Sequence, residues 1–212
     1  MAKNSFSFDS PLVQSFESVK DLLILNIWTV LCCIPVVTAG ASLAAMHTVA
    51  LKIQRNEEGY VTKDFFKAFR SNLKIGCKAS ILLILILGFI YADFYAISLL
   101  DIWFADVARV LLLVLGILLA LTLTFLFPVM AKFDAGLWNT IKNAFCFALS
   151  HIGKTLLMLI LNLIPWIICY YVNVLIPLLF FFGLSVPAIM GAKLYDKEFK
   201  RLEDAYYEKQ NI

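Results

Sequence analysis

Charged side chains are scarce in this sequence. Only 16% of the 212 residues are Asp, Glu, Lys or Arg, whereas about 25% is typical of soluble domains, and 62% of the residues are hydrophobic. A water-soluble globule of this length could not cover so much apolar surface. Disorder is also excluded, because disordered chains are poor in aromatic residues and 14% of this chain is aromatic. The composition predicts an integral membrane protein that forms one unit over residues 1–212.

Cysteine pairs and metal-ligand spacings are also missing. The cysteines are odd in number, lie within or beside apolar stretches, and show neither zinc-site nor disulfide spacing; they are Cys32, Cys33, Cys77, Cys146 and Cys169. His47 and His151 have no Cys, His or carboxylate at ligand spacing. We expect buried thiols and packed histidines, with no metal and no cofactor.

Signatures of catalysis are absent as well. The sequence contains no Gly-rich phosphate loop, no nucleophile elbow and no metalloprotease helix. The middles of its apolar segments hold no Asp, Glu, Lys, Arg or His, the groups that ion-driven transporters keep inside the membrane. We therefore expect no enzyme and no catalytic residue, and no substrate-binding residue is identified.

What the sequence does contain is long apolar runs. A membrane helix needs about 20 apolar residues. Residues 155–192 are uncharged throughout, and as a single helix they would be about 57 Å long, nearly twice the hydrocarbon thickness. They must fold back, and a turn is predicted at residues 170–173, with Pro177 just beyond. The sequence predicts an all-α polytopic membrane helix bundle, with later spans at about 73–97, 108–131, 153–171 and 174–195.

The first apolar region, residues 22–51, is interrupted by Pro35 and Gly40. Because proline removes a backbone donor, a kink or stop is expected near Ile34–Pro35. One interpretation is a span at 22–37 that continues as a broken helix to 55, with 41–55 along the interface, which gives five spans. The other is a tight hairpin, closed by small residues from Gly40 to Ala45, which gives six. A signal peptide cleaved near Ala39–Ala41 is a third.

Basic residues are confined to three segments. Residues 52–78, 132–154 and 193–209 hold 15 of the 18 Lys and Arg residues, and each segment flanks predicted spans. Because Lys and Arg concentrate in cytoplasmic loops, all three segments and the C-terminus are predicted to lie in the cytoplasm. A cytoplasmic C-terminal helix is expected at about 193–209. The same topology explains these cations without any nucleic-acid partner.

Two of these segments resemble each other. Residues 61–73 and 136–150 both place aromatic and aliphatic side chains on one helical stripe, and the copies align at an offset of 76 residues. Each is followed by an apolar hairpin that ends near a proline. This weak internal repeat predicts two amphipathic cytoplasmic helices lying at the interface with anionic lipid. Docking of a soluble domain on these helices is the alternative.

Few polar side chains lie within the predicted spans. Asn26, Asn162 and Asn173 are the main ones, and hydrogen bonding between helices is their usual role. A polar path through Asn26, Thr29 and Asn162 would instead indicate a small transporter or channel for a neutral solute.

One segment carries a family resemblance. It contains Leu25–Trp28, the stretch CCIPVVTAGA at residues 32–41, EEGYV at 57–61 and DFFKAFRSN at 64–72. These residues resemble the YesL-like family of bacterial integral membrane proteins, most strongly over about residues 15–80, and the PxxTxG stretch from Pro35 to Gly40 is intact. The resemblance implies a bacterial plasma membrane protein, and it transfers no catalytic residue. Since members often lie beside carbohydrate-uptake genes, it also implies a non-enzymatic accessory or regulatory component of a carbohydrate ABC-type uptake system, with the bilayer and a permease as partners.

Overall fold

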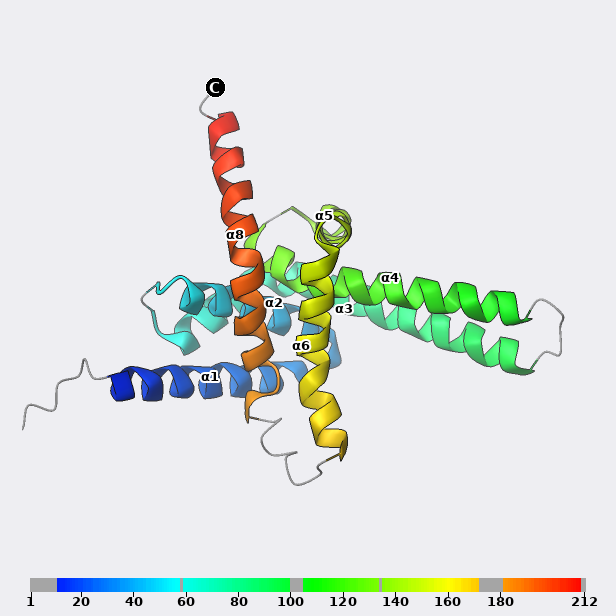
Figure 1. Ribbon diagram of the computed structural model, residues 1–212, viewed down its shortest axis with the longest axis horizontal. Helices are drawn as coiled ribbons and strands as arrows, with labels where there is room; N and C mark the ends of the chain where they lie inside the picture. Colours follow the sequence, from blue (N-terminus) through cyan, green and yellow to red (C-terminus); the bar gives the residue numbers. More distant parts are fainter. Residues whose placement is uncertain (1–10, 58, 100–104, 134, 172–180, 211–212) are drawn as a thin grey trace, which may run out of the picture.

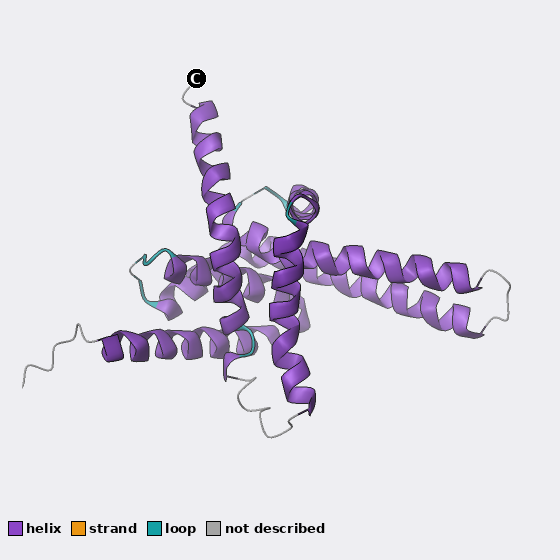
Figure 2. Cartoon of the chain, viewed as in Figure 1, coloured by secondary structure: helices purple, strands orange, loops and turns teal. Residues whose placement is uncertain are grey.

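The described part of the chain is helical. The computed structural model describes residues 11–57, 59–99, 105–133, 135–171 and 181–210, and no strand occurs in those ranges (Figure 2). The all-α prediction is therefore confirmed. The elements are α1 (Pro11–Cys33), the short 3-10 helix η1 (Val36–Thr38), α2 (Ala39–Gln54), α3 (Val61–Leu99), α4 (Ala105–Lys132), α5 (Leu137–Ser150), α6 (Ile152–Tyr171) and α8 (Ser185–Gln210).

Several helices have the length and composition of membrane spans. In the described ranges these are Val36–Gln54, Val61–Ile97 and Ala105–Lys132, and the bent pair α5 and α6 makes a fourth if it is counted as one span. Only 17% of the most apolar window of α3, and of α4, is buried, against 56% for α2. Although α3 and α4 pack against each other, most side chains of these windows are not fully buried, as expected of lipid-facing helices. Residues 172–180 lie outside the described residues, so the second half of the predicted turn and the start of the predicted span 174–195 are not described. α6 continues through Tyr171, into the predicted turn, and α8 begins at Ser185, within the predicted span.

The predicted break at Pro35 is confirmed. α1 ends at Cys33, and α2 begins at Ala39 after the turn of η1. The Thr38 hydroxyl donates to the carbonyls of Cys32 (2.7 Å) and Pro35 (2.8 Å), so it occupies the Cys32 acceptor that the end of α1 leaves open. The Ser42 hydroxyl donates to the Thr29 carbonyl at 2.8 Å, which holds α2 against α1. α1 and α2 are therefore in direct contact, but of the two only α2, together with η1, is among the candidate spans of the described residues, so this packing does not decide between five and six spans.

Small residues bring α2 even closer to α3. A methyl group added at Gly40 would lie 2.5 Å from the carbonyl oxygen of Gly76, and one added at Gly76 would collide with the backbone of Ala41. At the same place the Gly40 amide, which has no acceptor within α2 because it lies in the first turn, donates to the Ser80 hydroxyl at 2.7 Å. The two glycines and Ser80 thus join the backbones of two helices directly.

The two predicted interfacial helices differ in the structure. The first, residues 61–73, continues without interruption into the predicted span 73–97 as the single helix α3. The second corresponds to α5, which meets α6 at a bend of 104°. A bend frees carbonyls of the last turn, and the Thr155 hydroxyl occupies the Ala148 carbonyl at 2.9 Å. At the offset of 76 residues the first copy has Ala79 in place of Thr155 and no such hydroxyl.

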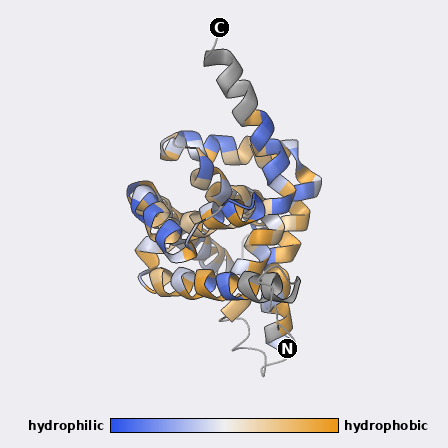
Figure 3. Ribbon diagram, turned by 90° about the vertical axis from the view of Figure 1, so that its left-hand side faces the viewer, coloured by the Kyte–Doolittle hydropathy of each residue, from blue (hydrophilic) through white to orange (hydrophobic). Residues whose placement is uncertain are grey.

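The helices form two hairpins around a central core. α3 and α4 lie side by side and project away from the other helices, while α6 and α8 lie side by side and run across that direction (Figure 1). The two copies of the sequence repeat therefore form hairpins that point in different directions. The core is formed by α1, α2, the first half of α3, the end of α4, α5, α6 and α8, and its largest fully buried side chains are Tyr195, Phe65, Phe125, Phe199 and Leu25. α8 is largely hydrophobic in its first turns and more hydrophilic in its middle turns (Figure 3).

Candidate functional site

Asn26 connects two helices that are far apart in sequence. Its Oδ1 atom accepts the backbone amides of Leu184 and Ser185, each at 2.9 Å, and Ser185 is the first residue of α8. The first amides of a helix have no partner within the helix, so the fully buried Asn26 side chain caps α8 from α1. The expected role of Asn26 in hydrogen bonding between helices is confirmed.

The other polar residues of the predicted solute path are not brought to Asn26 as a group. The buried Thr29 hydroxyl donates to the Leu25 carbonyl of its own helix at 2.7 Å. Asn162 is exposed on α6. Asn173 lies outside the described residues. Asn26 and Thr29 thus share α1, while Asn162 lies on the surface and does not line a path with them.

Both histidines contact aromatic side chains. His47 is buried, with Nδ1 3.2 Å from the Tyr195 hydroxyl. The His151 ring stacks on Phe147 with centroids 5.0 Å apart. In the ranges that the structure describes, no group of three or more His, Cys, Asp or Glu residues could hold a metal ion. The cysteines at 32, 33, 77 and 146 are free thiols, but the first three are only half-buried and Cys146 is exposed, so the expectation of buried thiols is wrong for them.

Two carboxylates of α8 join this helix to its neighbours. Asp196 accepts from Arg55, just past the end of α2, with Nε and Oδ1 2.6 Å apart, and both side chains are only about 13–14% exposed. Lys200, one turn further along α8, lies 3.3 Å from the other oxygen of Asp196. The pair between Arg55 and Asp196 is sheltered enough that removing one partner would leave a poorly solvated charge.

Glu198 makes the corresponding contacts to the corner between α5 and α6. Its Oε1 lies 2.9 Å from Nζ of Lys154, and its Oε2 lies 3.4 Å from Arg201 and 3.7 Å from Nε2 of His151. The hydrogen bond from Lys154 lowers the pKa of Glu198 below its ordinary value, and the nearby Arg201 and His151 act in the same direction. We call this set the α8 ion-pair cluster: Arg55, His151, Lys154, Asp196, Glu198, Lys200 and Arg201.

Sequence reasoning did not identify this cluster. Membrane topology accounts for the basic residues of the sequence without any ion pair, so it does not point to the acidic residues among them. The alternation of Asp196 and Glu198 with the basic residues of α8 is the signal that was available. Their partners, Arg55 just past the end of α2 and Lys154 on α6, lie 141 and 44 residues away in sequence, and such separations leave no periodic pattern.

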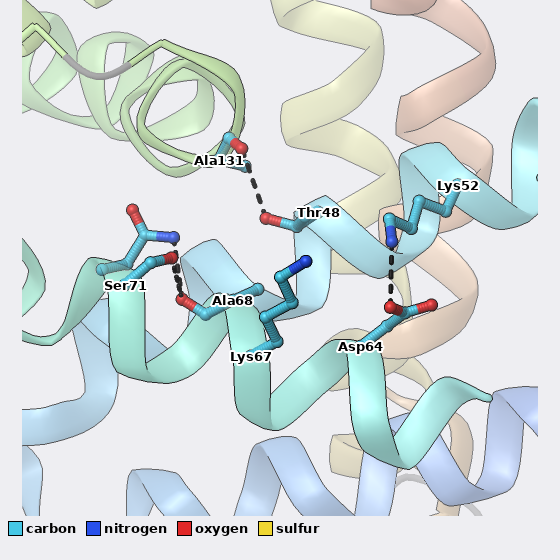
Figure 4. Close-up of a pocket in the computed structure, with 8 residues that line it drawn as sticks. Thr48, Lys52, Asp64, Lys67, Ala68, Ser71 and Ala131 are labelled. Atoms are coloured by element: carbon cyan, nitrogen blue, oxygen red, sulfur yellow. Dashed lines mark hydrogen bonds and ion pairs between the residues drawn. The ribbon is translucent and has the colours of Figure 1, made fainter. Parts of the chain in front are cut away.

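A cavity of about 210 Å³ lies between α2, α3 and the end of α4 (Figure 4). Its polar side chains are Thr48 and Lys52 of α2 and Asp64, Lys67, Ser71 and Asn72 of α3, with Ala68 and Ala131 completing the lining. Nζ of Lys52 lies 2.9 Å from Oδ1 of Asp64. The Thr48 hydroxyl is 3.3 Å from the Ala131 carbonyl and so connects α2 to the end of α4.

Comparison with known proteins gives one similarity. Residues 22–94 match the model of a family described as protein of unknown function, DUF624. The match covers about a third of the chain, from the second half of α1 through the Pro35 break and α2 to near the end of α3. It includes all the residues that line the cavity except Ala131. No curated protein and no solved structure matches the chain. Over this segment, the chain is similar to the DUF624 family.

Proposed function

We propose that this chain is a non-enzymatic, multi-pass protein of a bacterial plasma membrane that acts as an accessory or regulatory component of a carbohydrate ABC-type uptake system. The resemblance to YesL-like proteins supports the carbohydrate assignment, and the similarity to DUF624 over residues 22–94 agrees with that resemblance. The long apolar helices support the membrane location.

The observation that carries a role in protein contacts is the way α8 leaves the bundle. Its first turns are held by the Asn26 cap and its middle by the α8 ion-pair cluster. Beyond Lys200 the helix continues to Gln210, away from the other helices (Figure 1). A charged helix fixed at its base and free of its own bundle suits docking of a soluble partner, such as a cytoplasmic subunit of a transporter.

The location of that helix follows from charge. Its basic residues belong to the same cytoplasmic set as residues 52–78 and 132–154, so the projecting end of α8 faces the cytoplasm in this proposal. The alternative function, a small transporter for a neutral solute along Asn26, Thr29 and Asn162, is less well supported. Asn26 already accepts two backbone amides, and Asn162 is exposed.

Affinity purification tests the proposal. The tagged full chain is extracted from native membranes in mild detergent after growth on inducing sugars, and co-purifying proteins are identified by mass spectrometry. We expect a carbohydrate permease, its ATPase or its solute-binding protein. A matched variant that ends at Leu202 keeps the α8 ion-pair cluster and should lose this partner while retaining its melting temperature.

The accessory function is wrong if no component of an uptake system is recovered with the full chain. Docking through α8 is wrong if the shortened variant recovers the partner as well as the full chain does. Solute flux in liposomes, lowered by Asn162→Leu, would support the transporter instead.

A further inference from the structure

We propose that the cavity between α2, α3 and the end of α4 binds a phosphate group, with Lys67 and Lys52 as its cationic partners. This site is independent of the proposed docking through α8. The cavity is smaller than the roughly 300–1,000 Å³ of pockets that enclose drug-sized molecules, so it suits one compact charged group.

The charges of the lining favour an anion. The lining holds two cations, Lys52 and Lys67, and one carboxylate, Asp64. Asp64 turns toward Lys52, whereas the Lys67 ammonium points into the space between Thr48 and Asp64 (Figure 4). In the part of the chain that the structure describes, no carboxylate pairs with Lys67. The cavity therefore has an excess positive charge directed inward.

The lining also has hydrogen-bond donors to spare. An ammonium group carries three protons, so Lys67 offers three, and Lys52 keeps two after its contact with Asp64. Nδ2 of Asn72 uses one proton on the Ala68 carbonyl and retains another. The hydroxyls of Thr48 and Ser71 already donate to backbone carbonyls, so they are not among the spare donors. Several convergent donors with two ammonium groups match the oxygens of a phosphate.

The position of the cavity agrees with this ligand. It lies at the basic end of α3, where Lys63, Arg70 and Lys74 are also exposed. Further along α3 the surface becomes apolar, with Leu85 and Phe89 65% and 67% exposed. The change from basic to apolar surface marks the level at which lipid phosphates meet the protein. The phosphate can thus belong to a phospholipid headgroup or to a free anion, and the two sources present the same oxygens.

Calorimetry on the purified full chain in nonionic detergent tests the site. The two probes are inorganic phosphate and dihexanoyl phosphatidylglycerol, a short-chain anionic phospholipid. We expect saturable binding that Lys67→Met weakens about tenfold, because one charge-assisted contact is lost. The matched control is Lys197→Met, which removes an exposed lysine of α8 that is not part of the lining and should leave the affinity unchanged. Since Lys67 is exposed, its variant should keep the melting temperature of the parent.

Comparison of the two probes identifies the source of the phosphate. Tighter binding of the phospholipid assigns the site to a headgroup, and equal or tighter binding of inorganic phosphate assigns it to the free anion. Asp64→Asn should raise the affinity, because it removes the one negative charge of the lining. The inference is overturned if neither probe binds, if Lys67→Met binds as tightly as Lys197→Met, or if Asp64→Asn fails to raise the affinity.

Discussion

At the scale of single residues, the PxxTxG stretch has a structural explanation. Pro35 follows the end of α1, the Thr38 hydroxyl occupies the Cys32 carbonyl that this end leaves open, and Gly40 admits the backbone of α3. The same stretch carries the resemblance to YesL-like proteins, and it lies within the residues that match DUF624. The segment in which the chain is similar to the DUF624 family thus contains the residues that build the junction of α1, α2 and α3.

Adding a methyl group at the closest helix contact should destabilise the fold. Gly76→Ala places a Cβ against the Ala41 backbone, which cannot move aside as a flexible side chain would. We expect the free energy of unfolding to fall by about 1–3 kcal/mol, the usual cost of overpacking, as measured by denaturant titration in detergent. Gly88→Ala is the control, because nothing lies within 4 Å of its added Cβ. Equal stability of the two variants would contradict the close contact.

Removal of the α8 cap should also destabilise the protein. Asn26→Ala leaves the amides of Leu184 and Ser185 without their acceptor, and loss of a helix cap costs about 0.5–2 kcal/mol. The exposed Asn162 provides the comparison, and Asn162→Ala should leave the thermal midpoint in detergent nearly unchanged. A larger loss in Asn162→Ala would show that Asn162 makes the more important contact.

At the scale of elements, the sequence predicted where helices stop better than what they touch. Proline and clusters of charge indicate helix ends from neighbouring residues alone, so the break at Pro35 and the end of α4 at Lys132 could be predicted from the sequence. The continuity of α3 and the bend before α6 were not predicted. The continuity of α3 depends on packing against α2, and the bend before α6 depends on the Thr155 hydroxyl. Neither contact can be recognised from the spacing of hydrophobic residues in the sequence. The contacts of Asn26, Asp196 and Glu198 were missed because their partners are remote in sequence.

The attachment of α8 should depend on pH through Glu198. Its pKa is lower in the folded protein than in the unfolded chain, since it pairs with Lys154. The pair therefore contributes its full stability above the unfolded-state pKa, and this contribution is lost as the pH falls through the lower, folded-state value. Below about pH 5 the melting temperature of the parent should fall toward that of Glu198→Gln, whose own melting temperature lacks this component. A constant difference between the two proteins from pH 7 to pH 3 would contradict the pairing.

The helix α5 should lie at the membrane interface. Trp138 is 67% exposed, with the Lys142 ammonium 5.8 Å from the centre of its ring, and Phe145 and Leu149 are also exposed. Tryptophan beside lysine is typical of the headgroup level. In a variant that keeps Trp138 as its one tryptophan, spin-labelled lipids should quench fluorescence most strongly when the label is near the headgroup. Strongest quenching by a label at the bilayer centre, or none by any label, would refute this location.

At the scale of the whole molecule, the α3–α4 hairpin and the α6–α8 hairpin must be oriented differently relative to a bilayer. In the observed arrangement they run in different directions, so they cannot both stand along one membrane normal (Figure 1). The common side of the basic segments does not depend on this difference. Whether the chain after α5 crosses the bilayer twice or lies along it, α8 returns to the side from which α6 began. The charge distribution and the observed arrangement are therefore compatible.

Labelling of single cysteines in intact cells tests that common side. In a background without native cysteines, probes at Arg70 and Lys142 should react only after the membrane is permeabilised, because both lie in basic segments. A probe at Asp106, in the first turn of α4 at the far end of the α3–α4 hairpin, should react with an impermeant reagent from outside. The long apolar surfaces of α3 and α4 separate Asp106 from Arg70. External reaction at Arg70 or Lys142 would place the cavity and the α8 ion-pair cluster outside the cell, where neither a cytoplasmic partner nor the inner leaflet could reach them.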